Sequence, residues 1–167
     1  MSLQRVLSIT GKTKESVVFV ECDIRDEAKM TEVFETYGPL TSCIHFAGLK
    51  AVGESVAKPL EYYENNVGGS VSLLKVMQKF NCHDIVFSSS ATVYGDKPVA
   101  CETDSIQPTN PYGTTKAQIE VILKDQANAQ KKMSAVCLRY FNPVGAHASG
   151  EIGEDPEGIP NNLMPYI

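Results

Sequence analysis

Short apolar runs alternate along the chain with longer segments of helical periodicity. The runs are residues 17–20, 43–46, 85–87 and 135–138. Continuous apolar runs of this length, without alternation of polar residues, are typical of parallel strands covered on both faces. We therefore predict a parallel core strand at each of these positions.

Between these runs, apolar residues recur with the period of an α-helix. The pattern i, i+3, i+4, i+7 is formed by Met30, Val33, Phe34 and Tyr37, returns over residues 67–77, and is followed by a third helical pattern over residues 112–123. Strands that alternate with helices form βαβ units with right-handed crossovers, so we expect an α/β, doubly wound (Rossmann-like) parallel sheet. From about Asn142 onward, Gly, Pro, Asn and Glu predominate, which predicts a long loop.

Composition narrows the class of protein. The 167 residues fit one domain or a piece of a larger one, and 43% hydrophobic residues suffice for a buried core. The net charge of -5, with no run of basic residues, argues against a nucleic-acid partner. No apolar stretch is long enough to cross a bilayer and the start resembles no secretion signal, so we expect a cytoplasmic protein with no membrane association.

The cysteines and histidines predict no metal site and no disulfide framework. The five cysteines are widely spaced without a C-x-x-C pair, and the three histidines show no metal-ligand spacing. We expect buried free thiols, and histidines that are structural or face solvent.

The residues that carry chemistry lie at a strand end and at a helix start. Ser88, Ser89 and Ser90 end one predicted strand, while Tyr112 and Lys116 share one face of the next helix at i and i+4. A nearby ammonium stabilises a phenolate, and Ser90 can hydrogen-bond the oxygen that loses the proton. Together they form a proton-transfer device for oxidising an alcohol. A Tyr-x-x-x-Lys pair also occurs by chance on exposed helices, but ligands of open α/β sheets bind at the carboxyl edge.

These residues, with the segments around them, resemble the extended short-chain dehydrogenase/reductase family, and within it the UDP-glucose 4-epimerases. The resemblance runs through residues 44–55, 87–95, 110–113, 139–143 and 158–165. The strings H-F-A-G-L-K-A-V-G-E-S at 45–55 and G-A-H-A-S-G-E-I-G-E-D-P at 145–156 are its most specific parts.

The resemblance implies an isomerase that interconverts UDP-galactose and UDP-glucose with tightly held NAD. Ser90 and Tyr112 would handle the proton of the sugar 4-hydroxyl while hydride leaves C4. Lys116 would bind the nicotinamide ribose and support the Tyr112 phenolate. The 4-keto sugar would rotate and accept the hydride on its other face, with no net oxidation.

Further cofactor residues follow from matching positions. The implied NAD-binding set is Asp23, Ile24, Phe46, Ala47, Gly48, Lys50, Asn66, Tyr112, Lys116 and Tyr140. Asp23 would accept from the adenine amine, although an Asp there fits equally a cap of the helix that begins near Asp26. Gly48 would let the backbone approach the cofactor. Core packing is the alternative for Phe46, and a helix cap the alternative for Asn66.

The implied substrate-binding set overlaps with these residues. It comprises Lys50, Ser90, Ala91, Thr92, Tyr112, Tyr140, Phe141, Asn142, Asn161, Asn162 and Leu163. By composition alone, residues 161–163 would be an ordinary polar loop.

The glycine-rich pyrophosphate loop of the family is missing, because no G-x-x-G-x-x-G precedes a first helix. We expect a chain truncated at both ends: residues 1–141 as a partial NAD-binding domain lacking the first two strands, and residues 142–167 as the start of the substrate-binding loop, without the C-terminal substrate domain. In the family's strand order 3-2-1-4-5-6, the strand at 17–20 would lie two vacant positions from its nearest neighbour.

Alternative functions remain at this point. One is a non-catalytic form that binds a full-length subunit; another is a sugar-nucleotide dehydratase, although Ser90, Ala91 and Thr92 offer no carboxylate for its acid and base. We expect the 167 residues alone neither to hold NAD tightly nor to turn over substrate. The resemblance implies a homodimer for the full-length family, through helices that core packing would explain equally well.

Overall fold

The computed structural model describes residues 2–13 and 16–153, which form helices and a small parallel sheet. In chain order the elements are α1 (Ser2–Thr10), α2 (Glu27–Tyr37), β1 (Ser42–His45), α3 (Val52–Ala57), α4 (Pro59–Tyr62), the π-helical η1 (Tyr63–Gly68), α5 (Gly69–Lys79), β2 (Asp84–Ser90), the 3-10 helix η2 (Ala91–Tyr94), α6 (Pro111–Ala129) and β3 (Ser134–Tyr140). The chain divides into two units, Cys22–Phe141 and the two end segments Met1–Glu21 with Asn142–Ile167. The first unit holds the sheet.

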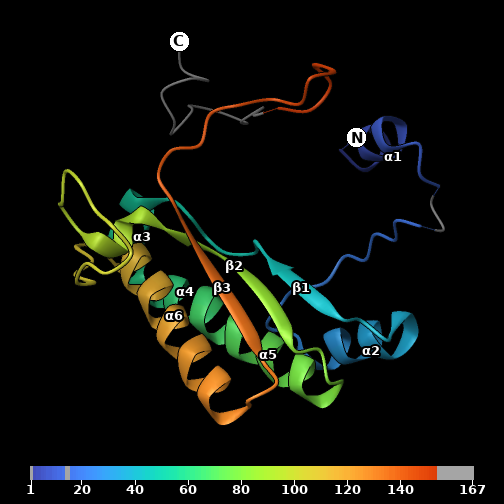
Figure 1. Ribbon diagram of the computed structural model, residues 1–167, viewed down its shortest axis with the longest axis horizontal. Coiled ribbons are helices and arrows are strands. Elements are labelled where there is room, and N and C mark those ends of the chain that lie inside the picture. The colour runs from blue at the N-terminus through green and yellow to red at the C-terminus, as the bar shows by residue number, and fades with distance from the viewer. Residues whose placement is uncertain (1, 14–15, 154–167) are drawn as a thin grey trace. The chain divides into compact units, whose positions relative to one another are not determined.

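The sheet has the strand order β1-β2-β3 with both pairs parallel. The chain passes from β1 to β2 through α5 and from β2 to β3 through α6, and both helices lie on the same face (Figure 1). Ile44, Val86 and Val136 lie side by side in the register. The prediction of an α/β parallel sheet with helical crossovers is therefore confirmed, and the strands at 43–46, 85–87 and 135–138 fall on β1, β2 and β3.

The expectation that both faces of these strands are covered is wrong for this unit. Ile44 is 65% exposed, Val136 48% and Leu138 38%. Both crossovers move across the sheet in the same direction, and right-handed crossovers of the same direction place their helices on one face. Side chains alternate between faces along a strand, so every second apolar residue points away from α5 and α6.

The core lies between the sheet and the helices α2, α5 and α6. Its buried members are Met30, Phe34, Leu73, Leu74, Val76, Met77, Cys82, Ile85, Phe87, Ile119 and Leu123. The helical periodicities predicted at 30–37, 67–77 and 112–123 all supply residues to this cluster or pack against it. Met77 and Ile119 are buried here, as core packing predicts, and a dimer contact through these helices stays a prediction.

Residues 17–20 do not form the predicted strand. Val18 and Phe19 are exposed, and among the described residues the sheet contains β1, β2 and β3 and no further strand. A strand is held by hydrogen bonds to a neighbour, so an apolar run without a pairing partner has no reason to stay extended as a strand. The apolar pattern of residues 17–20 is typical of a strand, but the described residues offer no neighbouring strand with which it pairs.

The remaining expectations concern the ends and the cysteines. Residues 142–153 contain no helix or strand, as the loop prediction required. All five cysteines are free, but only Cys82 is buried and Cys101 is exposed, so the expectation of uniformly buried thiols is wrong. In the part of the chain that the structure describes, no helix is both long and apolar enough to span a bilayer.

Candidate active site

Tyr112 and Lys116 are presented by the first turns of α6. Asn110 caps this helix, since its Oδ1 accepts from the Gly113 amide at 2.9 Å, and Pro111 stands at the first helical position, where its missing N–H costs nothing. Tyr112 is half-buried and Lys116 is 5% exposed. The sequence Asn-Pro-Tyr therefore fixes where the helix begins, and with it the direction of both functional side chains.

The Lys116 ammonium is held between the sheet and Tyr112. Its Nζ donates to the carbonyl of Ser88 at 2.6 Å and lies 4.8 Å from the Phe87 ring centroid and 5.8 Å from the Tyr112 ring centroid. Burial lowers the pKa of Lys116 to about 8. The structure therefore places the Lys116 ammonium beside the Tyr112 ring, and the proton-transfer role of the pair stays a prediction.

Ser90 ends β2 and keeps a donor to spare. Its Oγ accepts from the Thr92 amide at 3.2 Å and from the Thr92 hydroxyl at 2.9 Å. Because Oγ is the acceptor in both bonds, its own proton remains for a further acceptor. The start of α6 packs against this segment: a Cβ built on Gly113 would lie 2.9 Å from the Thr92 carbonyl oxygen. The structure thus brings the segments that carry Ser90 and Tyr112 together.

The turn after β1 lies over Lys116. Phe46, Ala47, Gly48 and Lys50 are all exposed. A Cβ built on Gly48 would lie 3.2 Å from Asn66 Oδ1 and 3.9 Å from Lys116 Nζ. The exposed backbone of this turn and the buried ammonium are therefore close neighbours, and the core-packing alternative for Phe46 is wrong because its side chain is 66% exposed.

Asn66 is not a helix cap, because it lies within η1, which continues directly into α5. It is 1% exposed, and its side-chain groups bind protein atoms of Leu49, Asn65 and Thr115. Whether it also touches a cofactor stays a prediction. Its observed contacts make it a connector between the turn after β1 and the helix α6.

His45 is a buried structural residue, as the sequence predicted. Its Nε2 is 2.8 Å from the Ser70 hydroxyl, which itself donates to the Asn66 carbonyl at 2.6 Å. The single proton of Ser70 is thereby used, so His45 Nε2 must carry the proton between them. Burial, and next the charge of Lys116, lower the pKa of His45 to about 4. The imidazole is neutral and does not compete with Lys116 as a cation.

Asp23 and Ile24 both contact other protein residues, and their part in binding a cofactor stays a prediction. The Asp23 carboxylate accepts from the Arg25 amide at 2.9 Å and pairs with the Arg25 guanidinium at 2.7 Å, which lowers the pKa of Asp23 to about 2. Asp26, not Asp23, caps α2, so the capping alternative for Asp23 is wrong. The side chain of Ile24 packs against Gly69, where a Cβ would lie 2.6 Å away, and against the core.

The other predicted residues lie near the ends of β2 and β3 or beyond. Tyr140 ends β3 directly beside Ser90 in the register, and Ala91 and Thr92 follow Ser90 in η2. Phe141 and Asn142 are exposed. Asn161, Asn162 and Leu163 lie outside the described residues.

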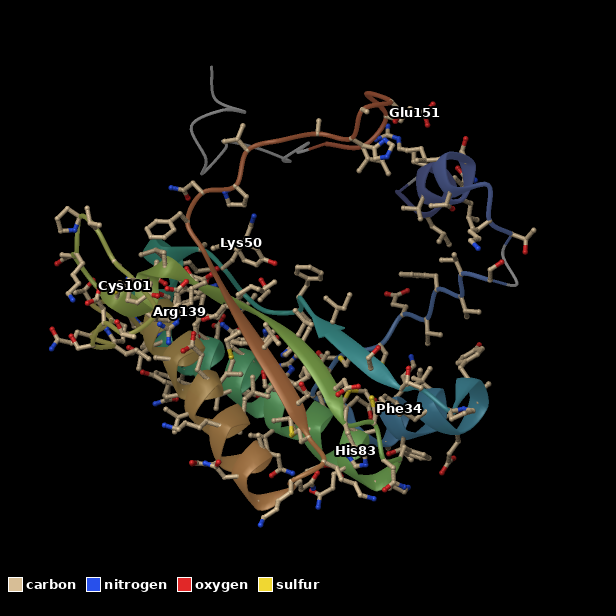
Figure 2. The ribbon with its side chains drawn as sticks, viewed as in Figure 1. Phe34, Lys50, His83, Cys101, Arg139 and Glu151 are labelled. Atoms are coloured by element: carbon tan, nitrogen blue, oxygen red, sulfur yellow. The ribbon has the colours of Figure 1, made fainter. Side chains whose placement is uncertain are left out.

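A buried ion pair behind the site was missed by sequence reasoning. Glu120 accepts from Arg139 at 2.6 Å and from the Ser89 hydroxyl at 2.5 Å, and Arg139 also donates to the Tyr94 hydroxyl at 2.9 Å (Figure 2 labels Arg139). The available signal was spacing: Glu120 follows Lys116 by four residues and so continues the Tyr112–Lys116 face of α6. The pair joins α6, β2, β3 and η2.

Comparison with known proteins assigns the chain to a family. A family model described as the NAD dependent epimerase/dehydratase family matches residues 4–167. The chain belongs to this family.

Relatives within the family cover the chain almost completely. A UDP-glucose 4-epimerase of Haemophilus influenzae is 56% identical over 169 residues, which are 99% of this chain and 49% of the relative. One of Pasteurella multocida is 57% identical with the same coverage. The crystal structure of UDP-glucose 4-epimerase from Bifidobacterium longum, in complex with NAD+ and UDP, has a TM-score of 0.90 at 54% identity, covering 98% of this chain and 49% of that one. The chain spans about half the length of these relatives, and its sheet matches part of their Rossmann-like fold.

The residues around Lys116 fit the dinucleotide that the family's description names. Gly48 places no side chain between the solvent-exposed turn and Lys116 Nζ. An ammonium has three donors, and the Ser88 carbonyl takes one of them, so two N–H groups remain for the hydroxyls of a ribose. Because glycine has no side chain, the protein backbone at such a turn lets a ribose approach the buried cation closely.

Proposed function

We propose that this protein interconverts UDP-galactose and UDP-glucose by transient oxidation at C4 of the sugar, with NAD as its cofactor. The observation that carries this proposal is the arrangement of Tyr112, Lys116 and Ser90 at the carboxyl edge of β2. When bound, NAD supplies the chemistry of accepting a hydride from the substrate and giving it back. The relatives named above support this choice of substrate, since both are UDP-glucose 4-epimerases and the match covers 99% of this chain.

The protein's own residues handle the proton. Tyr112 Oη, as phenolate, takes the proton from the sugar 4-hydroxyl while the C4–H bond breaks, and returns it when the C4–H bond re-forms on the other face. Lys116 stabilises the phenolate through its charge, and burial strengthens that effect because water does not screen it. Ser90 donates its free proton to the sugar O4, which keeps that oxygen beside Tyr112. No electron or proton is lost over the cycle.

The binding assignments divide between two turns. The turn after β1, with Phe46, Ala47, Gly48 and Lys50, binds NAD, and Lys116 adds its two free donors to the nicotinamide ribose. The ends of β2 and β3, with Ser90, Thr92 and Tyr140 among others, bind the nucleotide sugar. Their register, in which Ser90 and Tyr140 are neighbours, supports this grouping.

The experiment measures C4 interconversion directly. UDP-galactose and added NAD are incubated with a full-length protein that carries these residues, because the 167 residues alone are not expected to turn over substrate. The anomeric proton signals of the two UDP-sugars are followed by NMR. Tyr112→Phe should lower turnover by a factor on the order of 10² or more, with substrate affinity nearly unchanged, because only a positioned acid/base is lost. Tyr37→Phe, an exposed tyrosine of α2, is the control and should react like wild type. In that full-length protein, no turnover by wild type, or equal rates for wild type and Tyr112→Phe, would refute the proposal.

A further inference from the structure

Lys50 is held by its backbone neighbours on both sides, while its own side chain is free. On the N-terminal side, Leu49 makes two hydrogen bonds to one side chain: its amide donates to Asn66 Oδ1 at 2.8 Å, and its carbonyl accepts from Asn66 Nδ2 at 3.0 Å. This pairing is what a neighbouring β-strand would offer, supplied here by one amide side chain. The backbone at Leu49 therefore cannot rotate without breaking both bonds.

On the C-terminal side, Ala51 is held in the same way by a tyrosine. The Ala51 amide donates to Tyr62 Oη at 3.0 Å, and Tyr62 Oη lies 2.8 Å from the Ala51 carbonyl and 2.9 Å from Glu54 Oε2, both of which accept. One hydroxyl has one proton, so these two acceptors share it. Tyr62 is fully buried, and burial, then Glu54, raise its pKa to about 12. It therefore stays neutral and can both accept and donate.

The two holding residues come from one helical face. Tyr62 ends α4 and Asn66 lies in η1, four residues further on, so both side chains point toward the same turn. Asn66 Nδ2 also donates to the Thr115 hydroxyl at 3.1 Å, which neighbours Lys116 in α6. Through Asn66, the turn around Lys50 is therefore connected to α6, the helix that carries Tyr112 and Lys116.

The side chain that this arrangement presents is a cation with no partner. Lys50 is exposed, and within the described residues its ammonium makes no hydrogen bond or ion pair, unlike Lys58 and Lys75, which pair with glutamates. Figure 2 shows Lys50 at the carboxyl edge of the sheet, near the end of β3. A long flexible lysine loses less entropy on binding when its backbone is already fixed.

We propose that Tyr62 and Asn66 are positioning residues that fix the backbone on both sides of Lys50, so that its ammonium meets the diphosphate of a bound nucleotide. The role of Lys50 in this inference rests on the proposed function. The hydrogen bonds of Asn66 to Leu49 and of Tyr62 to Ala51, which we call the double clamp, do not. A diphosphate is common to NAD and to UDP-sugars, so both are used as probes below. The hydrogen bonds from Asn66 and from Tyr62 should act as one unit, because each restrains a residue next to Lys50.

The first test measures, without any ligand, how firmly the Tyr62 hydroxyl holds the backbone of Ala51. Tyr62→Phe removes one oxygen from a fully buried ring, and it should speed amide hydrogen exchange at Ala51 by at least tenfold. Exchange at Phe87 in the core should not change, which separates local opening from global loss of stability. Tyr63→Phe is the matched control on the neighbouring residue and should leave Ala51 as in wild type. Unchanged exchange at Ala51 in Tyr62→Phe would overturn the clamp.

The second test reads the coupling to Lys50. UDP and NAD are titrated separately into wild type, Lys50→Met, Tyr62→Phe and the double variant. Tyr62→Phe should weaken binding of at least one of the two probes about fivefold, and should have no further effect once Lys50 is methionine. The probe that responds identifies the source of the diphosphate. A merely structural tyrosine gives additive losses, which would overturn the positioning role.

The outcomes separate this inference from the proposed function. Equal binding of both probes by wild type and Lys50→Met removes Lys50 from the site and overturns the inference, whatever Tyr112→Phe does to turnover. Failure of the proposed function shows instead as absent C4 interconversion. In that case, coupled binding losses would still support Tyr62 and Lys50 as parts of one diphosphate-binding device.

Discussion

Two turns follow strands at the same edge of the sheet, and they differ in their exposure and in the residues that restrain them. The turn after β1, residues 46–51, is largely exposed and takes its hydrogen bonds from the side chains of α4 and η1. The turn after β2, which is η2, is buried: Val93 is fully buried and Tyr94 nearly so. Its restraints come from its own Thr92 and from Arg139 on β3.

The difference follows from what each turn has to offer. An exposed turn can meet a ligand with its backbone and with Lys50, but it cannot be rigid through packing, so other elements must hold it. A buried turn is rigid through packing, and it presents the hydroxyl of Ser90 at its start. One turn therefore provides a surface and the other a fixed point. Lys116 lies beside the first turn and binds the Ser88 carbonyl in β2, the strand that leads to the second.

The largest expected effect comes from releasing the buried turn. Arg139→Leu removes the partner of Glu120, whose side chain is only 7% exposed, and leaves the Tyr94 hydroxyl without its donor. Breaking a buried pair by removing one partner costs about 3–5 kcal/mol. Here the Glu120 carboxylate would keep the Ser89 hydroxyl as a donor but would stay buried without an opposite charge. Chemical denaturation measures this loss of unfolding free energy.

Two variants sharpen the result for Arg139. Lys75→Met removes an exposed pair with Glu27 and should stay within about 0.5 kcal/mol of wild type. Arg139→Leu combined with Glu120→Leu should recover most of the loss, because no charge remains buried. A single variant as stable as wild type would show that η2 does not depend on this pair.

The next effect is a pH dependence at the residue between the two turns. The pKa of Lys116 is about 8 in the folded protein, against a usual value of 10.5. Between these values the unfolded chain binds a proton that the folded protein has released, so stability rises with pH across this window. Relative to Lys116→Met, wild type should gain about 3 kcal/mol from pH 7.5 to pH 10.5. Urea unfolding of both proteins at the two pH values measures the difference, and equal pH profiles would place Lys116 in a wetter environment than the structure does.

Sequence patterns predicted the core elements because hydrophobic periodicity directly reflects burial. The helix α2, with Met30 and Phe34, and the strand β2, with Ile85 and Phe87, needed no information beyond their own residues. The run at residues 17–20 shows the limit of this logic. Its pattern is as strand-like as that of β2, but a strand also needs a partner, and pairing is a property of the whole sheet.

The candidate site divides along the same line. Tyr112, Lys116 and Ser90 could be found from spacing and from their positions at a helix start and a strand end. The roles of Tyr62, Glu120 and Arg139 could not, because each depends on contacts with residues distant in the chain, such as the bond from Arg139 to Tyr94. Asp23 illustrates a third case, in which a near neighbour, Arg25, engages the carboxylate and changes the simplest interpretation.

The smallest effect tests the backbone of the buried turn. Gly95 ends η2 with φ at +73°, a conformation that favours glycine, and a Cβ there would collide with the Gln107 carbonyl oxygen. Gly95→Ala should therefore destabilise the protein by about 1–3 kcal/mol. Gly53→Ala is the control from α3, next to the exposed turn: nothing lies within 4 Å of its Cβ, and alanine favours a helix, so stability should stay level or rise slightly. Thermal unfolding of the two variants compares the turns directly, and equal loss in both would mean that the buried turn is no more tightly constrained than the exposed one.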